Sequence, residues 1–113
     1  MTKSKITSHI LDTEIGKPAR GVNISLEVFN DGAWTNIGRG TTDNDGRVID
    51  WLTYDIKEGR YKISFEVEDY FKSQGRESFY PHVSIEFYLK NTNEHYHVPL
   101  LLNAHGYSTY RGS

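Results

Sequence analysis

Apolar and polar residues alternate along three segments, and this alternation predicts β-strands that each bury one face. Residues 22–28 read V-N-I-S-L-E-V, and residues 61–67 and 83–89 repeat the same period of two. Successive side chains of a strand point to opposite faces, so each segment has one apolar and one polar face. Strands of this kind are typical of antiparallel sheets with one solvated side, which is the arrangement we expect here.

Five shorter segments carry weaker strand patterns and are separated by turn-forming sequences such as N-D-G, D-N-D-G and K-E-G. They are residues 6–11, 34–38, 47–50, 95–102 and 106–110. Only residues 69–74 have a helical character, and Gly75 is suited to the left-handed conformation that ends a helix. Seven or eight strands at this spacing predict an all-β, two-sheet antiparallel β-sandwich with one short helix. The pattern does not by itself choose the topology.

Length and composition limit the classes of protein that the chain can belong to. The 113 residues suit a single domain spanning 1–113, and the absence of cysteine excludes disulfides and zinc-thiolate sites. The net charge of -2, without a run of lysine or arginine, gives no reason to expect a nucleic-acid partner. We find no apolar stretch of signal-peptide or membrane-spanning character, so no membrane association and a cytoplasmic location are expected.

Two histidines, His95 and His97, stand two positions apart in a predicted strand. Their side chains should share one face, with Cα atoms roughly 6.5 Å apart. Such a pair can bind zinc, but a catalytic zinc takes a third protein ligand, and the sequence offers no obvious one. We therefore expect no metal.

Several motifs distributed over nearly the whole chain resemble those of the transthyretin-like family. They are S-H-I-L-D-T-x-x-G-K-P-A-x-G-V near the start, then T-x-x-D-G-R, G-R-Y and D-Y-F, and finally Y-H-V-P-L-L and Y-R-G-S. The resemblance is to the branch that hydrolyses 5-hydroxyisourate. It implies a transthyretin-like sandwich and a hydrolase of urate degradation that opens a six-membered ring with water and forms a carboxylated ureidoimidazoline. It implies no cofactor.

The resemblance also implies the site residues. The catalytic set corresponds to His9, Arg47, His97 and Ser113. Histidine exchanges protons near neutral pH, and we favour His97 as the activator of water and His9 as its proton-shuttling partner, although the sequence does not decide which is base and which is acid. The planar donors of Arg47 suit the flat edges of a purine-derived ring and an oxyanion. Ser113 has no nucleophile elbow around it, so we assign it to binding or to positioning water.

The last residues of the chain are expected to close the substrate pocket. Tyr110, Arg111, Gly112 and Ser113 form the Y-R-G-S motif, which in this family contributes to substrate binding together with Arg47. Between the last two strands, many relatives have a Ser-Pro-aromatic sequence, whereas this chain has N-A-H at residues 103–105. We expect a different loop shape there but the same reaction.

The expected partners are the small-molecule substrate and further copies of the chain. The family forms a homotetramer, a dimer of dimers, with sites in a channel where the dimers meet. One alternative is a transthyretin-type carrier that binds a hydrophobic hormone without catalysis, and another is an adhesion-like sandwich module. Carriers of this fold lack the set of two histidines, arginine and Y-R-G-S, and the adhesion interpretation explains none of these polar residues.

Overall fold

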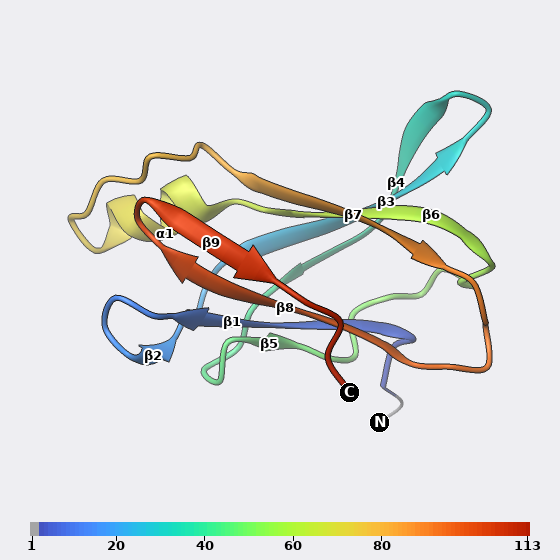
Figure 1. Cartoon of the computed structure of the whole chain (residues 1–113), viewed down its shortest axis with the longest axis horizontal. Helices are drawn as coiled ribbons and strands as arrows, with labels where there is room; N and C mark the ends of the chain where they lie inside the picture. The colour runs from blue at the N-terminus through green and yellow to red at the C-terminus, as the bar shows by residue number, and fades with distance from the viewer. Residues whose placement is uncertain (1–2) are drawn as a thin grey trace.

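The computed structural model describes residues 3–113 and contains two β-sheets packed against each other, with one short helix at one end (Figure 1). The strands are β1 (Ile6–Asp12), β2 (Lys17–Pro18), β3 (Asn23–Asn30), β4 (Ala33–Thr41), β5 (Arg47–Val48), β6 (Gly59–Phe65), β7 (Val83–Leu89), β8 (Tyr96–Asn103) and β9 (Gly106–Thr109), and the helix is α1 (Val67–Ser73). One sheet has the order β2-β1-β8-β9, with β5 also paired to β1. The other has the order β4-β3-β6-β7, and its β3–β4 hairpin projects beyond the sandwich. The predicted two-sheet all-β fold is confirmed.

The core lies between the sheets and is built by the alternating residues that the sequence identified. The alternate residues of β3, namely Ile24, Leu26 and Val28, are buried, and β6 contributes Tyr61, Ile63 and Phe65 in the same way. Because every second residue of these strands turns inward, their polar partners remain on the outer face.

One strand pair departs from the predicted antiparallel arrangement, because β1 and β8 run parallel. Parallel strands need a long connection, and about 90 residues separate the paired positions Ser8 and Val98. Neither strand shows clean alternation: β1 is buried at five of its seven positions and β8 at five of its eight. This more continuous burial is typical of parallel strands, so the expectation of purely antiparallel sheets was wrong for this pair.

Several strand boundaries differ from the predicted ones. β4 extends from Ala33 to Thr41 because it pairs along the full length of β3, with a bulge between Leu26 and Glu27. β5 is only two residues long rather than four, and the edge strand β2 was not predicted. The proline of β2 lies at a sheet edge, where its missing N–H costs no ladder hydrogen bond.

The helix begins two residues before the predicted start. Val67 continues the alternation of β6, but it enters the core as the first residue of α1, where Tyr70 and Phe71 share its buried face. This spacing of three and four residues outweighs the strand-like pattern that precedes it. Gly75 has a φ of 69° and ends the helix as predicted, and the Arg76 N–H donates to the Phe71 carbonyl.

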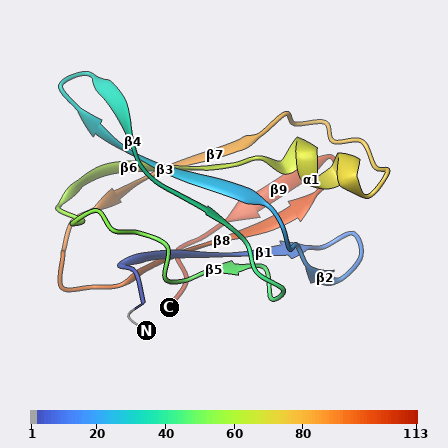
Figure 2. The same cartoon turned by 180° about the vertical axis from the view of Figure 1, so that it is seen from behind.

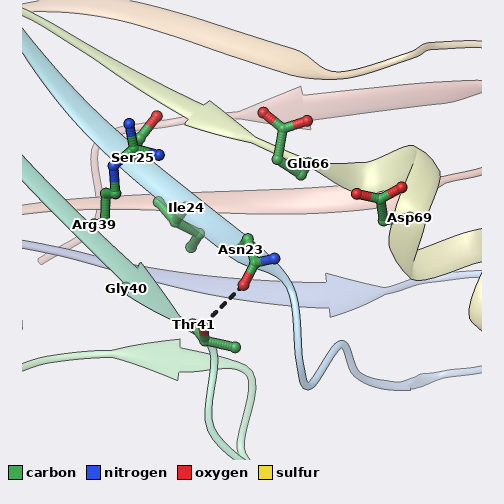
Figure 3. A pocket seen from close by; sticks show the side chains of 8 residues that line it. All are labelled: Asn23, Ile24, Ser25, Arg39, Gly40, Thr41, Glu66 and Asp69. Carbon is green, nitrogen blue, oxygen red and sulfur yellow. Dashed lines mark hydrogen bonds between the residues drawn. The ribbon is translucent and has the colours of Figure 1, made fainter. Parts of the chain in front are cut away.

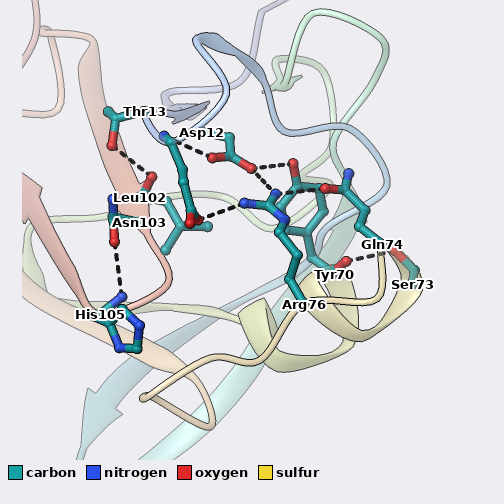
Figure 4. A network of polar contacts seen from close by, with 10 residues as sticks. Asp12, Thr13, Tyr70, Ser73, Gln74, Arg76, Leu102, Asn103 and His105 are labelled. Carbon is teal, nitrogen blue, oxygen red and sulfur yellow. Dashed lines mark hydrogen bonds and ion pairs between the residues drawn. The ribbon is translucent and has the colours of Figure 1, made fainter.

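A buried carboxylate ties the end of β1 to the helix region (Figure 4). Asp12 is fully buried and accepts hydrogen bonds from the Tyr70 hydroxyl at 2.7 Å and from the Arg76 guanidinium, which also pairs with Glu14 at 2.7 Å. Burial opposes ionisation of Asp12, but the hydrogen bonds from Arg76 and Tyr70 outweigh it and lower the pKa of that carboxyl. Burial and the adjacent carboxylate raise the pKa of Tyr70 to about 12.

The two ends of the described chain lie side by side, as both views show (Figures 1 and 2). Lys3 and Ser113 line the same cavity, together with Thr7 near the start of β1 and His97 near the start of β8. No helix among residues 3–113 has the length and apolar character that crossing a membrane requires.

Candidate active site

The predicted histidines and arginine meet on the outer face of the β2-β1-β8-β9 sheet. In the β1–β8 pair Thr7 lies opposite His97, and in the β1–β5 pair His9 lies opposite Arg47. Residues two apart on a strand share a face, and so do residues directly opposite each other on paired strands. Three strands that are distant in sequence therefore place Thr7, His9, Arg47 and His97 on one surface.

The Thr7 hydroxyl lies between two histidines: His97, which is in β8, and His95, which directly precedes that strand. Thr7 Oγ1 is 2.8 Å from His97 Nδ1 and 3.1 Å from His95 Nε2, both within hydrogen-bond distance. The two rings are nearly parallel, with an interplanar angle of 20° and centroids 6.4 Å apart. Thr7 is almost completely buried beneath them, with 2% of its surface exposed.

Arg47 is placed by the D-N-D-G turn that precedes it. The Asp43 carboxylate accepts hydrogen bonds from the Asp45 and Arg47 N–H groups at 2.9 and 3.0 Å. Gly46 has a φ of 74°, and a Cβ at this position would lie 2.5 Å from the Ile10 carbonyl oxygen, so only glycine fits. The turn thus fixes the backbone of Arg47 as it enters β5, and its side chain is half-buried.

The segment after β9 returns across β8 and ends beside His97. The Gly112 N–H donates to the His97 carbonyl at 2.8 Å and forms an isolated antiparallel bridge. A Cβ on Gly112 would lie 2.6 Å from His97 Cδ2, so the missing side chain makes room for the imidazole. Ser113 follows directly and lines the same cavity as His97 and Arg47.

Tyr110 and Arg111, the other half of the terminal motif, lie elsewhere. Arg111 pairs with Glu94 at 2.9 Å, and its guanidinium stands 4.4 Å from the centre of the Tyr96 ring. Together with Tyr110 it lines a separate hollow beside β7, and Tyr110 is 57% exposed. Only the second half of Y-R-G-S therefore reaches the histidine cavity.

The histidine cavity is small and open on one side. Its volume is about 170 Å³, and its lining residues are Lys3, Thr7, Arg47, Ile49, His95, His97 and Ser113. His9 is not among them, although it faces the same side of the sheet next to Arg47. Pockets for small organic ligands are usually about 300–1,000 Å³, so the cavity needs a second surface to enclose one.

Burial and nearby positive charges favour the neutral form of all three histidines. Burial, Arg47 and His95 lower the pKa of His97, and burial and Arg47 lower the pKa of His9. For His95, burial acts together with Lys3, and Lys5 contributes less to the lowering of its pKa. A neutral imidazole has a free lone pair, which is what a general base requires.

No three His, Cys, Asp or Glu side chains within residues 3–113 are grouped closely enough to hold a metal ion. The point where nitrogens of His95 and His97 converge is occupied by the Thr7 hydroxyl, which both contact. Zinc sites in proteins use at least three protein ligands, so the arrangement of the described residues does not favour one.

A larger hollow lies on the other sheet, between β3, β4 and the start of α1 (Figure 3). Its charged lining residues are Arg39, Glu66 and Asp69. The two carboxylates and the guanidinium lie around an open surface, and no imidazole is present. It therefore lacks a group suited to proton transfer near neutral pH.

Sequence reasoning missed the contribution of Thr7, and it assigned no role to His95. The spacing of Thr7 and His9 on a predicted strand was a signal that both share a face. Placing Thr7 beneath the H-x-H pair, however, requires the β1–β8 register, which the sequence pattern did not provide. Lys3 reaches the cavity only because the chain ends lie together.

Known proteins resemble this chain in both sequence and fold. A sequence model of the HIUase/Transthyretin family matches residues 6–112. The 5-hydroxyisourate hydrolase of Salmonella typhimurium is 47% identical over 109 residues, covering 96% of this chain and 80% of the relative. The structure of Klebsiella pneumoniae 5-hydroxyisourate hydrolase superimposes with a TM-score of 0.85 and 34% identity over the full length of both chains.

Sea bream transthyretin, solved with thyroxine, shares the fold with a TM-score of 0.91 and 28% identity, covering 96% of this chain and 95% of its own. The fold alone thus accommodates both a hydrolase and a thyroxine-binding protein. With the family model matching nearly every described residue, this chain belongs to the HIUase/Transthyretin family.

Proposed function

We propose that this protein is a hydrolase that opens the six-membered ring of 5-hydroxyisourate with water. The observation that carries the proposal is the convergence of His97, Arg47 and Ser113 on one cavity, with His9 beside Arg47. The hydrolases named above, one of them 47% identical to this chain, support the same reaction class. The product is the carboxylated ureidoimidazoline, and the cleaved bond is a cyclic amide C–N bond.

The geometry supports a division of roles among the four residues. The His97 ring takes a proton from the attacking water, and His9 serves as the partner that shuttles protons on the neighbouring strand. Arg47 holds the substrate ring and stabilises the negative charge that develops on the attacked carbonyl oxygen. Ser113 positions water or substrate at the open side of the cavity.

No cofactor is needed in this mechanism, because imidazole and water suffice for both proton transfers. We also propose a homotetramer, a dimer of dimers, that completes each site. The cavity is too small to enclose a bicyclic substrate, and Leu11 and Leu101 lie half-buried on the same outer face. A second copy of the sheet would both cover this face and close the cavity.

The carrier alternative is disfavoured by the chemistry of the cavity. Binding a hydrophobic hormone does not require histidines of lowered pKa close to an arginine, whereas hydrolysis uses groups of this kind. The two functions also differ in what they do to their small molecules. A carrier would bind thyroxine and leave 5-hydroxyisourate unchanged.

One assay tests the proposal directly. Urate oxidase generates 5-hydroxyisourate, and its ultraviolet decay is followed with and without the protein, before and after exhaustive chelation. We expect acceleration that chelation does not diminish and that His97→Asn removes. An unaltered decay with the wild-type protein, especially together with thyroxine binding, would overturn the proposed function, and activity that returns only with zinc would overturn the metal-free mechanism. Sedimentation of the same samples measures the oligomeric state.

A further inference from the structure

The Thr7 hydroxyl links His97 to His95, a residue without a role in the mechanism proposed above. A hydroxyl carries a single hydrogen, so Thr7 can donate to only one of the two imidazoles that it contacts. If it donates to His95 Nε2, it must accept from His97 Nδ1–H, and the His97 Nε2 lone pair is then free. If it donates to His97 Nδ1, the arrangement reverses and His97 carries its hydrogen on Nε2. The protonation states of the two rings are therefore coupled through one oxygen atom.

Only the first arrangement leaves the lone pair of His97 Nε2, the ring nitrogen that Thr7 does not contact, free to act as a base. The ring nitrogen that takes a proton is selected by the hydrogen bond that the other nitrogen makes. Thr7 is 2% exposed, so its hydroxyl has little contact with bulk water. The hydroxyl is also held in place, because the paired strands β1 and β8 fix both Thr7 and His97.

The proposed reaction produces a carboxylic acid, which is ionised at neutral pH because its ordinary pKa is roughly 3.5. That acid proton is lost after ring opening, whereas the two proton transfers at His97 are a loss from the attacking water and a gain by the departing ring nitrogen. His97 lies against Gly112 and lines the cavity with Arg47, whereas His95 is partly exposed and lies near Lys3 and Lys5. A route from His97 through Thr7 to His95 would connect the reacting groups to solvent.

We infer that Thr7 and His95 form a proton relay behind His97, an inference that rests on the proposed hydrolase function. As His97 Nε2 takes the proton of the attacking water, its Nδ1 hydrogen passes to Thr7 Oγ1, and the hydroxyl hydrogen passes to His95 Nε2. His95 becomes an imidazolium and loses its Nδ1 hydrogen to solvent. His97 is left neutral with its hydrogen on Nε2, and Thr7 is again a hydroxyl.

A pass in the opposite direction restores the starting state. As His97 Nε2 returns its hydrogen to the reaction, Nδ1 regains one from Thr7, which is resupplied from His95 Nε2, and solvent reprotonates His95 Nδ1. No proton is created or lost in either direction. Burial, together with Lys3 and Lys5, lowers the pKa of His95, which favours loss of the proton from the His95 cation to solvent.

Two substitutions of Thr7 distinguish a need for its hydroxyl from a need for its shape. Thr7→Val keeps the shape and removes the hydroxyl, so we expect kcat to fall about 10- to 100-fold, as when a metal-bound imidazole loses the partner that orients it. Thr7→Ser keeps the hydroxyl and should recover most of the rate. Equal activity of the valine and serine variants would overturn the relay.

His95→Asn tests the solvent end of the route. We expect a lower kcat with little change in KM, and partial recovery when a small buffer such as imidazole is added, because the buffer can accept the proton in place of His95. His105→Asn, at an exposed loop position, is the matched control and should show neither effect. An unchanged kcat in His95→Asn, or a loss that no buffer concentration relieves, would overturn the role of His95 as proton acceptor.

Nitrogen-15 chemical shifts of the imidazoles provide a readout that does not depend on activity. If the rings are coupled through the hydroxyl, Thr7→Val changes the tautomers of both, and His95→Asn changes the tautomer of His97. Unchanged His97 shifts in both variants would overturn the relay. A wild-type protein without hydrolytic activity would refute the proposed function instead, and the coupling of the rings would still be measured.

Discussion

The missing side chain of Gly112 gives the sharpest test of the site, because alanine there would collide with the imidazole of His97. The added Cβ would lie 2.6 Å from His97 Cδ2, whereas carbon atoms in contact are about 3.5–4.0 Å apart. Relieving the collision requires a shift of roughly 1 Å, either by the ring or by the segment that carries Ser113. A displacement of about 1 Å can cost about 10²-fold in rate, so we expect Gly112→Ala to lose activity by about this factor.

The backbone does not cause this effect, since Gly112 is not among the residues of positive φ. Gly106→Ala is the matched control: it lies at the start of β9, also without a positive φ, and its Cβ would meet no atom within 4 Å. We would measure kcat by the decay of 5-hydroxyisourate and thermal stability by calorimetry. Wild-type activity in Gly112→Ala, or an equal loss in Gly106→Ala, would refute the argument that the glycine makes room for His97.

Three further predictions concern charge and proton transfer. His97→Asn should lower the rate by about 10²- to 10⁴-fold with the fold intact, whereas the exposed His105→Asn should not, as steady-state kinetics and circular dichroism would show. Arg47→Lys should fail to restore what Arg47→Ala loses, and because Arg47 lowers the pKa of His97, the alanine variant should shift the acid limb of the pH–rate profile to higher pH. Arg76→Ala should destabilise the fold by about 3–5 kcal/mol in urea unfolding at pH 7, since it leaves the buried Asp12 carboxylate without its cation. Asp12 has a lowered pKa in the folded state, so its contribution should be present above its ordinary pKa of 3.8 and be lost as the pH falls through the lowered value. A difference of less than about 1 kcal/mol between the free energies of unfolding of wild type and Arg76→Ala would contradict the claim that Arg76 stabilises the buried Asp12 carboxylate.

The strands with clean alternation were predictable because a single periodicity determined them. Residues 83–89 were predicted as a strand and are β7, and the two-sheet sandwich follows from several segments of this kind. The pattern failed where one residue suits two structures: Val67 completes the alternation of β6, yet it is buried as the first residue of α1. It also failed for the parallel β1–β8 pair, because pairing between distant segments leaves no local periodic signal.

In the candidate site, too, features set by neighbouring residues were predictable, whereas features set by the pairing of distant strands were not. The H-x-H spacing was sufficient to place His95 and His97 on one face, and the two rings indeed lie nearly parallel. That Thr7 lies beneath them depends on strand register, which is set by packing of the whole sheet. Resemblance identified the terminal motif as one unit, but Arg111 and Ser113 line different cavities. On a regular strand, residues two apart would share a face, but β9 ends at Thr109 and the chain beyond it does not continue as a regular strand. The roles of these residues remain predictions.

The pairing of β1 with β8 has a consequence for how the protein reaches its native state. Contacts between segments about 90 residues apart require closure of nearly the whole chain, and such non-local pairings slow folding. The β3–β4 and β6–β7 pairs are closer in sequence and can form without either end of the chain. The groups around His97 come together only when the first and last strands meet, so a chain trapped halfway would hold much of its β-structure but no complete site. Recovery of enzymatic activity during refolding would accordingly time the last long-range closure rather than the appearance of secondary structure.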